Sequence, residues 1–131
     1  MGMEPSEQIR RWETAKEHRE AAQQLLMNGL FQASVSRSYY ACFHAMWIAV
    51  GDPPLGHWKH AGLMKTFCFG KWLTPPVLPA SLAVIYKKIL TLYDLRLDAD
   101  YRAVSLDQDK AKEALDTANQ IHAMVVQHKN L

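Results

Sequence analysis

Arg37, Tyr40 and His44 have helical spacing, so their side chains should share one face of a helix, spread over about 10 Å of its axis. Such residues suit phosphate chemistry, because a histidine exchanges a proton near neutral pH and an arginine holds phosphate charge. Arg11 and His18 repeat the spacing of arginine and histidine. We therefore treat Arg37 and His44 as candidate catalytic residues that could share one phosphate.

A structural interpretation competes with this catalytic one. Helical side chains lean towards the N-terminus, so Arg37 leans away from His44. An arginine in apolar surroundings must be paired, and the segment Arg96–Tyr101 offers carboxylates. We favour the interpretation that Arg37 pairs with one of them while His44 binds a backbone carbonyl. Arg37→Ala should then lower the free energy of unfolding by roughly 2–4 kcal/mol, because a carboxylate is left uncompensated.

The segment around Arg96 allows two arrangements. Arg96 and Asp100 are four residues apart, which permits an ion pair within one helix, and Asp94, Asp98 and Arg102 repeat this spacing. One arrangement is a solvated ladder of charges. The other is a polar, nucleotide-binding cluster, whose members would be Arg37, Tyr40, His60, Arg96, Asp100 and Tyr101.

With His60-Ala61-Gly62 between them, the segments Arg37–Ala41 and Arg96–Tyr101 resemble the HEPN family, in particular its small stand-alone bacterial and archaeal members. Those carry an arginine-x-tyrosine-tyrosine-alanine helix, a histidine-x-glycine step and a closing arginine-x-x-alanine-aspartate-tyrosine, in this order. The resemblance runs from about Ala15 to Val126. It implies a helical bundle, usually a homodimer, that is often paired with a minimal nucleotidyltransferase in toxin–antitoxin or stress systems.

The resemblance also implies where catalysis would take place. Active members cut RNA without a metal, using an arginine that is followed by a histidine after four to six residues, usually late in the chain. Here the late arginine is Arg96, and Tyr101 stands in the histidine's place. The resemblance adds that a tyrosine close to this arginine can accept a nucleotide from a partner transferase. Catalysis would therefore need Arg37 with His44, or Arg96 with a histidine from elsewhere.

Composition limits the possible classes of protein. The 131 residues are 49% hydrophobic, which suits one folded domain over residues 1–131 and excludes disorder. The longest nearly apolar stretch, Ala41–Val50, is too short for a membrane span, and the polar N-terminus does not resemble a secretory signal, so we expect a cytoplasmic protein. A net charge of +2 does not by itself indicate nucleic-acid binding. Cys42 and Cys68 should be reduced core residues.

Hydrophobic periodicity predicts an all-α fold, an up-and-down bundle of four long helices plus a shorter fifth. The expected helices are 5–28, 31–50, 58–71, one opened by Pro79 and one opened by Ser105. Ser6 should cap the first helix and Gly29 should end it. The second helix is apolar nearly all round, so it is central or lies between the core and a partner subunit. From this surplus of apolar surface we expect a homodimer.

Ligand sets for a metal or cofactor are incomplete, and we expect neither. His57 and His60 have a metal-like spacing, but no cysteine or carboxylate is placed to complete the site. The chain also lacks phosphate-binding glycine motifs. Trp58 and Trp72 could stack on a nucleic acid, but we favour a structural role at the end of the bundle.

The resemblance thus predicts a HEPN-type component of a two-gene toxin–antitoxin or stress system, partnered by a minimal nucleotidyltransferase and binding nucleotide or RNA. Two alternatives stay open. The first is a metal-independent endoribonuclease toxin that uses Arg37, His44 or Arg96, and the second is a non-catalytic helical adaptor.

Overall fold

The computed structural model describes residues 3–69, 72, 79–129 and 131. Over these residues the chain is all-α, as predicted. The helices are α1 (Pro5–Met27), α2 (Phe31–Val50), α3 (His60–Phe69), α4 (Pro79–Asp100) and α5 (Gln108–Lys129). Four are long and α3 is short, and no strand occurs among the described residues.

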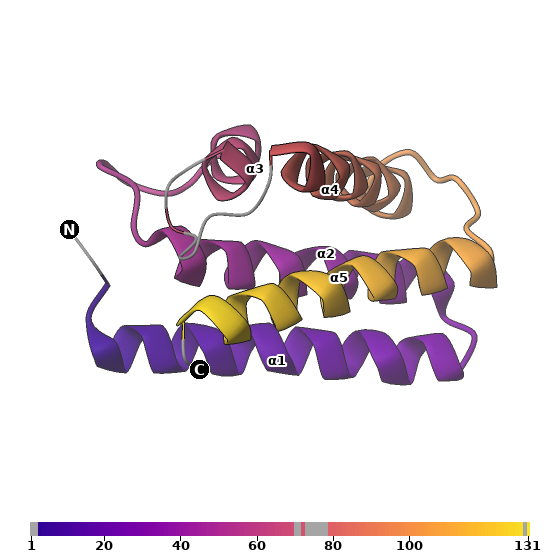
Figure 1. The fold of residues 1–131 in the computed structure, drawn as a ribbon. Helices are drawn as coiled ribbons and strands as arrows, with labels where there is room; N and C mark the ends of the chain where they lie inside the picture. Colours follow the sequence, from indigo (N-terminus) through magenta and orange to yellow (C-terminus); the bar gives the residue numbers. More distant parts are fainter. Residues whose placement is uncertain (1–2, 70–71, 73–78, 130) are drawn as a thin grey trace.

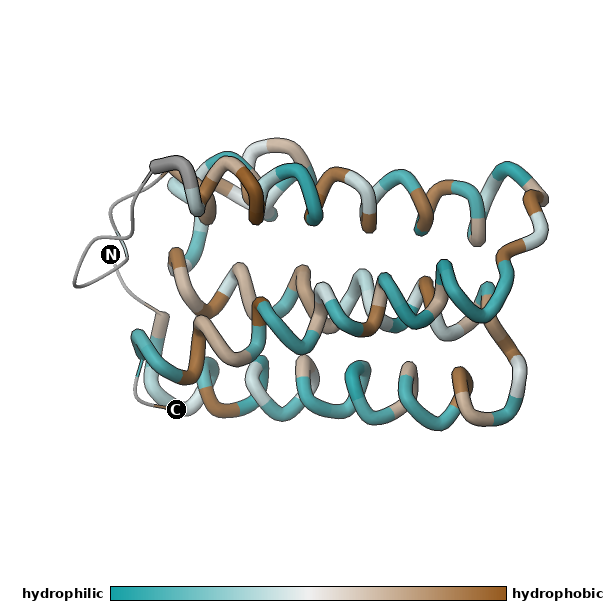
Figure 2. The backbone as a smooth tube through the Cα atoms, turned by 45° about the vertical axis from the view of Figure 1, so that its right-hand side comes forward, coloured by the Kyte–Doolittle hydropathy of each residue, from teal (hydrophilic) through white to brown (hydrophobic). Residues whose placement is uncertain are grey.

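The helices stack in layers, with α2 and α5 lying between α1 and the pair α3 and α4 (Figure 1). The chain reverses direction from α1 to α2 and again from α4 to α5, which gives the bundle its up-and-down course. Along the helices, hydrophobic positions recur between hydrophilic ones (Figure 2). Each helix can therefore turn one face to the core and another to water.

The centre of the bundle is α2, which contacts each of the other four helices. Its buried side chains lie on nearly every side of the helix: Ser34, Val35, Ser38, Tyr39, Ala41, Cys42, Ala45, Met46, Trp47, Ile48 and Ala49. Of the two positions predicted for this helix, the central one is therefore correct. Its apolar surface is covered by its own chain, so it no longer argues for a partner subunit, and the homodimer stays a prediction.

Small residues let α1 and α2 approach closely. Ala15 and Ala22 of α1 are fully buried. Ser34 of α2 is also fully buried, and its Oγ donates a hydrogen bond to the carbonyl oxygen of Ala22 over 2.7 Å. A buried hydroxyl needs such an acceptor, and it finds one at a single register of the two helices. This bond therefore helps to fix which residues of α1 and α2 face each other.

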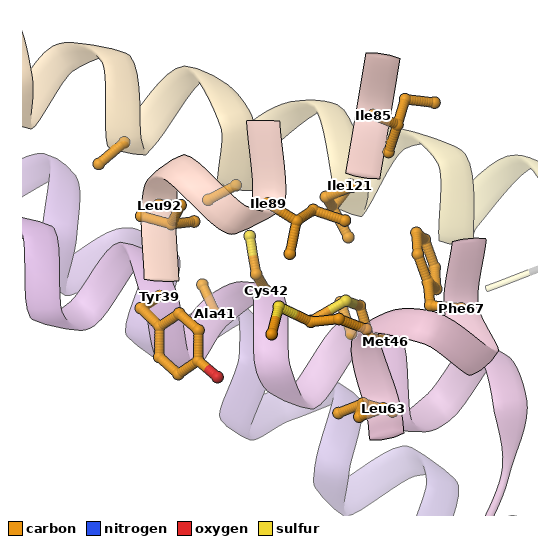
Figure 3. Packing of buried hydrophobic residues seen from close by; sticks show 14 of the residues in the cluster. Tyr39, Ala41, Cys42, Met46, Leu63, Phe67, Ile85, Ile89, Leu92 and Ile121 are labelled. Atoms are coloured by element: carbon orange, nitrogen blue, oxygen red, sulfur yellow. The ribbon is translucent and has the colours of Figure 1, made fainter. Parts of the chain in front are cut away.

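Apolar side chains from α2, α3, α4 and α5 meet in one core (Figure 3). Met46, Phe67, Ile89 and Ile121 are among its fully buried members. Cys42 and Cys68 are buried free thiols in the same core, as predicted. Burial raises the pKa of the Cys68 thiol to about 12, which keeps it protonated and unreactive.

Several predicted helix boundaries are correct. Gly29 adopts a φ of 75° directly after α1, where a left-handed residue was expected. Pro79 opens α4, where its fixed φ suits the first helical turn. The end predicted for α3, Lys71, lies outside the described residues, and α3 begins at His60 rather than at Trp58.

Two predicted caps are wrong. Ser6 lies inside α1, which begins at Pro5 and follows Glu4 without a side-chain cap. At the last helix the cap is Asp107 rather than Ser105, because the Oδ1 of Asp107 accepts the backbone N–H of Lys110 over 2.9 Å. In both cases another polar or proline residue close by was equally suited to start the helix.

His122 of α5 is a fully buried titratable group in the bundle. Its Nε2 donates to the carbonyl oxygen of Ala41 over 2.9 Å, and its ring lies 4.9 Å from that of Trp12. Burial, reinforced by the nearby Arg19 and opposed by the bond to Ala41, lowers the pKa of His122 to about 4. The ring is therefore neutral at pH 7, and folding must exclude its protonated form.

Acid should accordingly destabilise the fold through His122. The unfolded chain, with an ordinary histidine pKa of about 6.5, binds this proton between about pH 6.5 and 4, whereas the folded chain does not. The free energy of unfolding should therefore fall as pH falls through this window, by on the order of 3 kcal/mol from this residue. His122→Gln keeps an amide donor for Ala41 and removes the titration.

Urea unfolding measured at intervals between pH 7 and 4 gives the comparison. His122→Gln should show a clearly shallower loss of stability than the wild type. His57→Gln, at an exposed residue, is the control and should follow the wild type. Parallel curves for His122→Gln and the wild type would show that the ring is not buried in its neutral form.

Candidate functional site

Arg96 of α4 is only 4% exposed and is surrounded by four tyrosine rings. Its guanidinium carbon lies 4.8 Å from the ring centre of Tyr39, 5.3 Å from Tyr93, 5.6 Å from Tyr101 and 5.8 Å from Tyr40. The electron-rich face of an aromatic ring attracts a cation, and more strongly once water is removed. We call Arg96 and these four rings the tyrosine cage.

Three parts of the chain supply the tyrosine cage. Tyr39 and Tyr40 come from the central helix α2, and Tyr93 precedes Arg96 by about one turn of α4. Tyr101 follows the last residue of α4, where its backbone N–H donates to the carbonyl oxygen of Leu97. This final turn folds the Tyr101 ring back over Arg96 while 72% of the residue remains exposed.

The charged residues from Asp94 to Arg102 form both predicted arrangements, a polar cluster around Arg96 and a solvated ladder of charges. Arg96 forms a partly buried ion pair with Asp100, at 3.6 Å. Arg102 lies in solvent and pairs with Asp94 at 2.9 Å and with Asp98 at 3.1 Å, which is the solvated ladder. The Nε of Arg96 is buried without a hydrogen-bond partner among the described residues. The tyrosine rings and one carboxylate therefore provide most of the compensation for burying this cation.

His60, the first residue of α3, packs against the same tyrosines. Its ring centre lies 5.5 Å from those of Tyr39 and Tyr93, and its Nδ1 has a short contact with the Tyr39 hydroxyl. Burial and the charge of Arg96 lower the pKa of His60, and burial raises that of Tyr39. The neutral histidine therefore accepts the hydrogen bond and the tyrosine donates it. The structure thus places a histidine from another helix beside the late arginine.

Arg37 and His44 are arranged differently from the interpretation favoured above, which is wrong for both. Arg37 is exposed, and its Nη1 lies 3.4 Å from Nδ1 of His18 rather than near a carboxylate of the segment 96–101. His44 contacts Arg11 (Nη1 to Nδ1, 3.1 Å) rather than a backbone carbonyl. The error has a physical cause: α1 covers this side of α2 and supplies partners that spacing within α2 cannot show.

The sequence identified most of the tyrosine cage and missed two members. The predicted cluster of Tyr40, His60, Arg96, Asp100 and Tyr101 is brought together, whereas Arg37 lies with His18. Tyr39 and Tyr93 were not selected as site residues. Both could have been found, because Tyr93 precedes Arg96 by three residues, a helical neighbour, and Tyr39 belongs to the same tyrosine pair as Tyr40.

The two tryptophans considered for stacking on a nucleic acid are held by hydrogen bonds to the backbone. Trp58 and Trp72 are partly buried, and each indole N–H donates to a backbone carbonyl oxygen, of Gly51 and of Phe67 respectively. Among the described residues there is no group of three or more His, Cys, Asp or Glu able to hold a metal ion. Within that same part of the chain, the helices are too short or too polar to cross a membrane.

Because Arg96 is buried and Arg37 is exposed, we expect alanine substitutions at these two arginines to affect stability to different degrees. Arg96→Ala should lower the free energy of unfolding by about 2–4 kcal/mol, because it opens a cavity between four rings and leaves Asp100 unpaired. Arg37→Ala should change it by less than about 1 kcal/mol, since its side chain is exposed and makes one weak contact.

Thermal and urea unfolding of the two variants test this contrast. Arg96→Met serves as a control for volume, because an apolar side chain of similar length fills the space without a charge to desolvate, and it should be closer to the wild type than Arg96→Ala. If Arg37→Ala proved the more damaging of the two alanine variants, the burial of Arg96 described here would be wrong.

Comparison with known proteins shows the family to which the chain belongs. A family model described as HEPN domain matches residues 9–129, which include α2, the whole tyrosine cage and the Arg–His contacts between α1 and α2. A Methanocaldococcus jannaschii protein named "Putative toxin MJ0605" is 34% identical over 104 residues, covering 79% of this chain and 74% of that protein. The chain therefore belongs to the HEPN domain family.

Proposed function

We propose that this protein is a toxin-type HEPN component of a two-gene system, with a minimal nucleotidyltransferase as its partner and the tyrosine cage as its nucleotide- or RNA-binding site. The observation that carries the proposal is the position of Tyr101. Its ring is largely exposed, yet it lies against the cation of Arg96. Membership of the HEPN family and the toxin name of the archaeal relative support the toxin-like part.

The chemistry of the tyrosine cage suits a base or a nucleotide. An exposed tyrosine ring offers a face on which a base can stack, and an arginine beneath it adds attraction for phosphate. Asp100, at 3.6 Å from Arg96, balances the charge in part. A ligand phosphate would thus compete with this carboxylate for the guanidinium.

In this proposal Tyr101 is also the acceptor for the partner enzyme. The phenol oxygen would form a bond to the α-phosphate of ATP, pyrophosphate would leave, and a base of the transferase would take the phenol proton. The exposed position of Tyr101 after the end of α4 allows a second protein to reach its hydroxyl. Attachment of a nucleotide would cover Arg96 and so block the site.

Tyr101→Phe tests this role, because it keeps the ring over Arg96 and removes only the oxygen. We expect a stability loss below about 1.5 kcal/mol, the net contribution of one hydrogen bond, together with complete loss of nucleotide attachment. Mass spectrometry after incubation with the cognate transferase and ATP measures the adduct. Tyr86→Phe, a partly buried tyrosine of α4 that packs on Phe69, is the control and should still be modified. An adduct on Tyr101→Phe would exclude Tyr101.

Metal-independent RNA cleavage is a second candidate function, and His60 is the observation that favours it. The family signature pairs an arginine with a histidine, and here the tyrosine cage brings His60 to the surroundings of Arg96. His60 is neutral at pH 7 because its pKa is lowered. Its acceptor nitrogen Nδ1 is the one that the Tyr39 hydroxyl contacts. A ribose 2′-hydroxyl that replaced this contact could give its proton to Nδ1 while Arg96 stabilises the charge that develops on the phosphate.

Cleavage of a labelled single-stranded RNA, with EDTA present, tests this candidate. If the tyrosine cage is the active centre, His60→Gln and Arg96→Met should each lower the rate by 10²-fold or more, roughly the contribution of one acid–base or electrostatic group. His57→Ala, at an exposed histidine outside the tyrosine cage and the contacts between α1 and α2, should then cleave like the wild type. If cleavage were lost in His44→Ala alone, the reaction would take place between α1 and α2. If the wild type did not cleave the RNA, only the binding function would be left.

A further inference from the structure

The two arginine–histidine repeats of the sequence are paired crosswise in the bundle. Because α1 and α2 run in opposite directions, the arginine of each repeat contacts the histidine of the other. Nη1 of Arg11 lies 3.1 Å from Nδ1 of His44, and Nη1 of Arg37 lies 3.4 Å from Nδ1 of His18. The two imidazole rings stack, with centres 5.5 Å apart and planes inclined by 6°. We call these four residues the crossed quartet.

Neither arginine of the crossed quartet has an ion pair with a carboxylate among the described residues. Glu7 and Asp52 lie near Arg11 and partly oppose the effect of burial, which lowers the pKa of its guanidinium. Asp52 instead accepts the indole N–H of Trp47, over whose ring the Arg11 guanidinium lies at 3.8 Å. The Nε of Arg11 is buried and has no partner in the part of the chain that the structure describes. Arg11 thus retains donors that no anion occupies.

An open pocket lies directly beside this arginine. It has a volume of about 290 Å³ and is lined by Glu7, Arg10, Arg11, Thr14 and His44. Two guanidinium groups face one carboxylate in it, so its charge is positive while His44 is neutral. Four of the lining residues recur along one side of α1 at spacings of about one helical turn, and His44 comes from α2. The Thr14 hydroxyl donates to the carbonyl oxygen of Arg10 over 3.0 Å. A tetrahedral anion fits this volume and would find two guanidinium groups and an imidazole.

We propose that this pocket binds a phosphate group, of a nucleotide or of an RNA backbone, with Arg10 and Arg11 as the charged ligands and His44 as a further donor. This site is separate from the tyrosine cage. Arg37, which is exposed, adds a positive charge further along the contact between α1 and α2.

Proton uptake accompanies binding. In the structure Arg11 donates to Nδ1 of His44, which is possible only while the imidazole is neutral. Burial, together with Arg11 and His18, lowers the pKa of His44 to about 4. Burial and the charge of Arg37 also lower the pKa of His18, and the charge of Glu17 partly opposes this. A bound dianion stabilises the protonated imidazole. Once protonated, His44 no longer accepts from Arg11, so the guanidinium is free to donate to the phosphate.

Sulfate is the probe for this coupling, because it is a tetrahedral dianion that does not titrate between pH 5 and 7. In calorimetric titrations of the full chain, the sulfate association constant should rise as pH falls across this range, by up to about tenfold per unit for one proton taken up. Arg11→Met, whose side chain can still pack on Trp47, should weaken binding by about tenfold or more. His44→Gln should bind sulfate with little dependence on pH.

Matched controls separate the pocket from net charge and from the tyrosine cage. Arg19→Gln removes one positive charge from the same helix, outside the crossed quartet and the pocket, and should bind sulfate within about twofold of the wild type. Nucleotide attachment to Tyr101 should persist in Arg11→Met and is read by mass spectrometry rather than by sulfate titration, so failure of this site and failure of the function proposed for the tyrosine cage can be told apart. Inorganic phosphate, AMP and a short RNA, compared under the same conditions, distinguish the source of the phosphate.

Sulfate binding that is equal in the wild type, Arg11→Met and Arg19→Gln would overturn the proposal, as would no binding by the wild type. Arg11→Met with a lower melting temperature and unchanged sulfate affinity would mean that the crossed quartet only joins the two helices. Circular dichroism of each variant establishes that it is folded, and Arg10→Gln gives a second test that leaves the packing on Trp47 intact.

Discussion

The central constraint in this protein is the burial of α2. A helix that is apolar on nearly all sides must be covered over most of its surface, and the other four helices do this. Several polar groups of α2 therefore lie where it contacts its neighbours. Tyr39 and Tyr40 meet α4 around Arg96, while Arg37 and His44 meet α1. Both candidate sites thus follow from the way in which one helix is covered.

Tyr40 joins these two sites. Its ring belongs to the tyrosine cage, 5.8 Å from the Arg96 guanidinium, and it also lies 5.9 Å from the ring of His18. In each site cations are held by aromatic rings and neutral imidazoles more than by carboxylates, which leaves them attractive to an anion.

The sequence predicts the helices of this fold well because hydrophobic periodicity, Gly29 and Pro79 act locally. It also identifies Arg96, Asp100 and Tyr101, which are at most five residues apart in the sequence. The partners of Arg37 and His44 could not be predicted in this way, because they belong to α1 and depend on the register of two helices. That register depends on small buried residues and on the bond from Ser34 to Ala22, whose effect appears only once the helices pack. His60, by contrast, was among the predicted members of the cluster, and it reaches the tyrosine cage from α3 through tertiary packing.

The short turn at Gly29 has a consequence for variation in chain length. One inserted residue would rotate the start of α2 by about 100° relative to α1. Because both contacts of the crossed quartet span this single hairpin, the insertion would break them together and would also separate Ser34 from Ala22. The loop between α2 and α3 is under no such restriction where Leu55 and Gly56 are exposed. Insertions and deletions compatible with this architecture therefore belong in that loop. The length of the α1–α2 turn, in contrast, determines how α2 is rotated relative to α1.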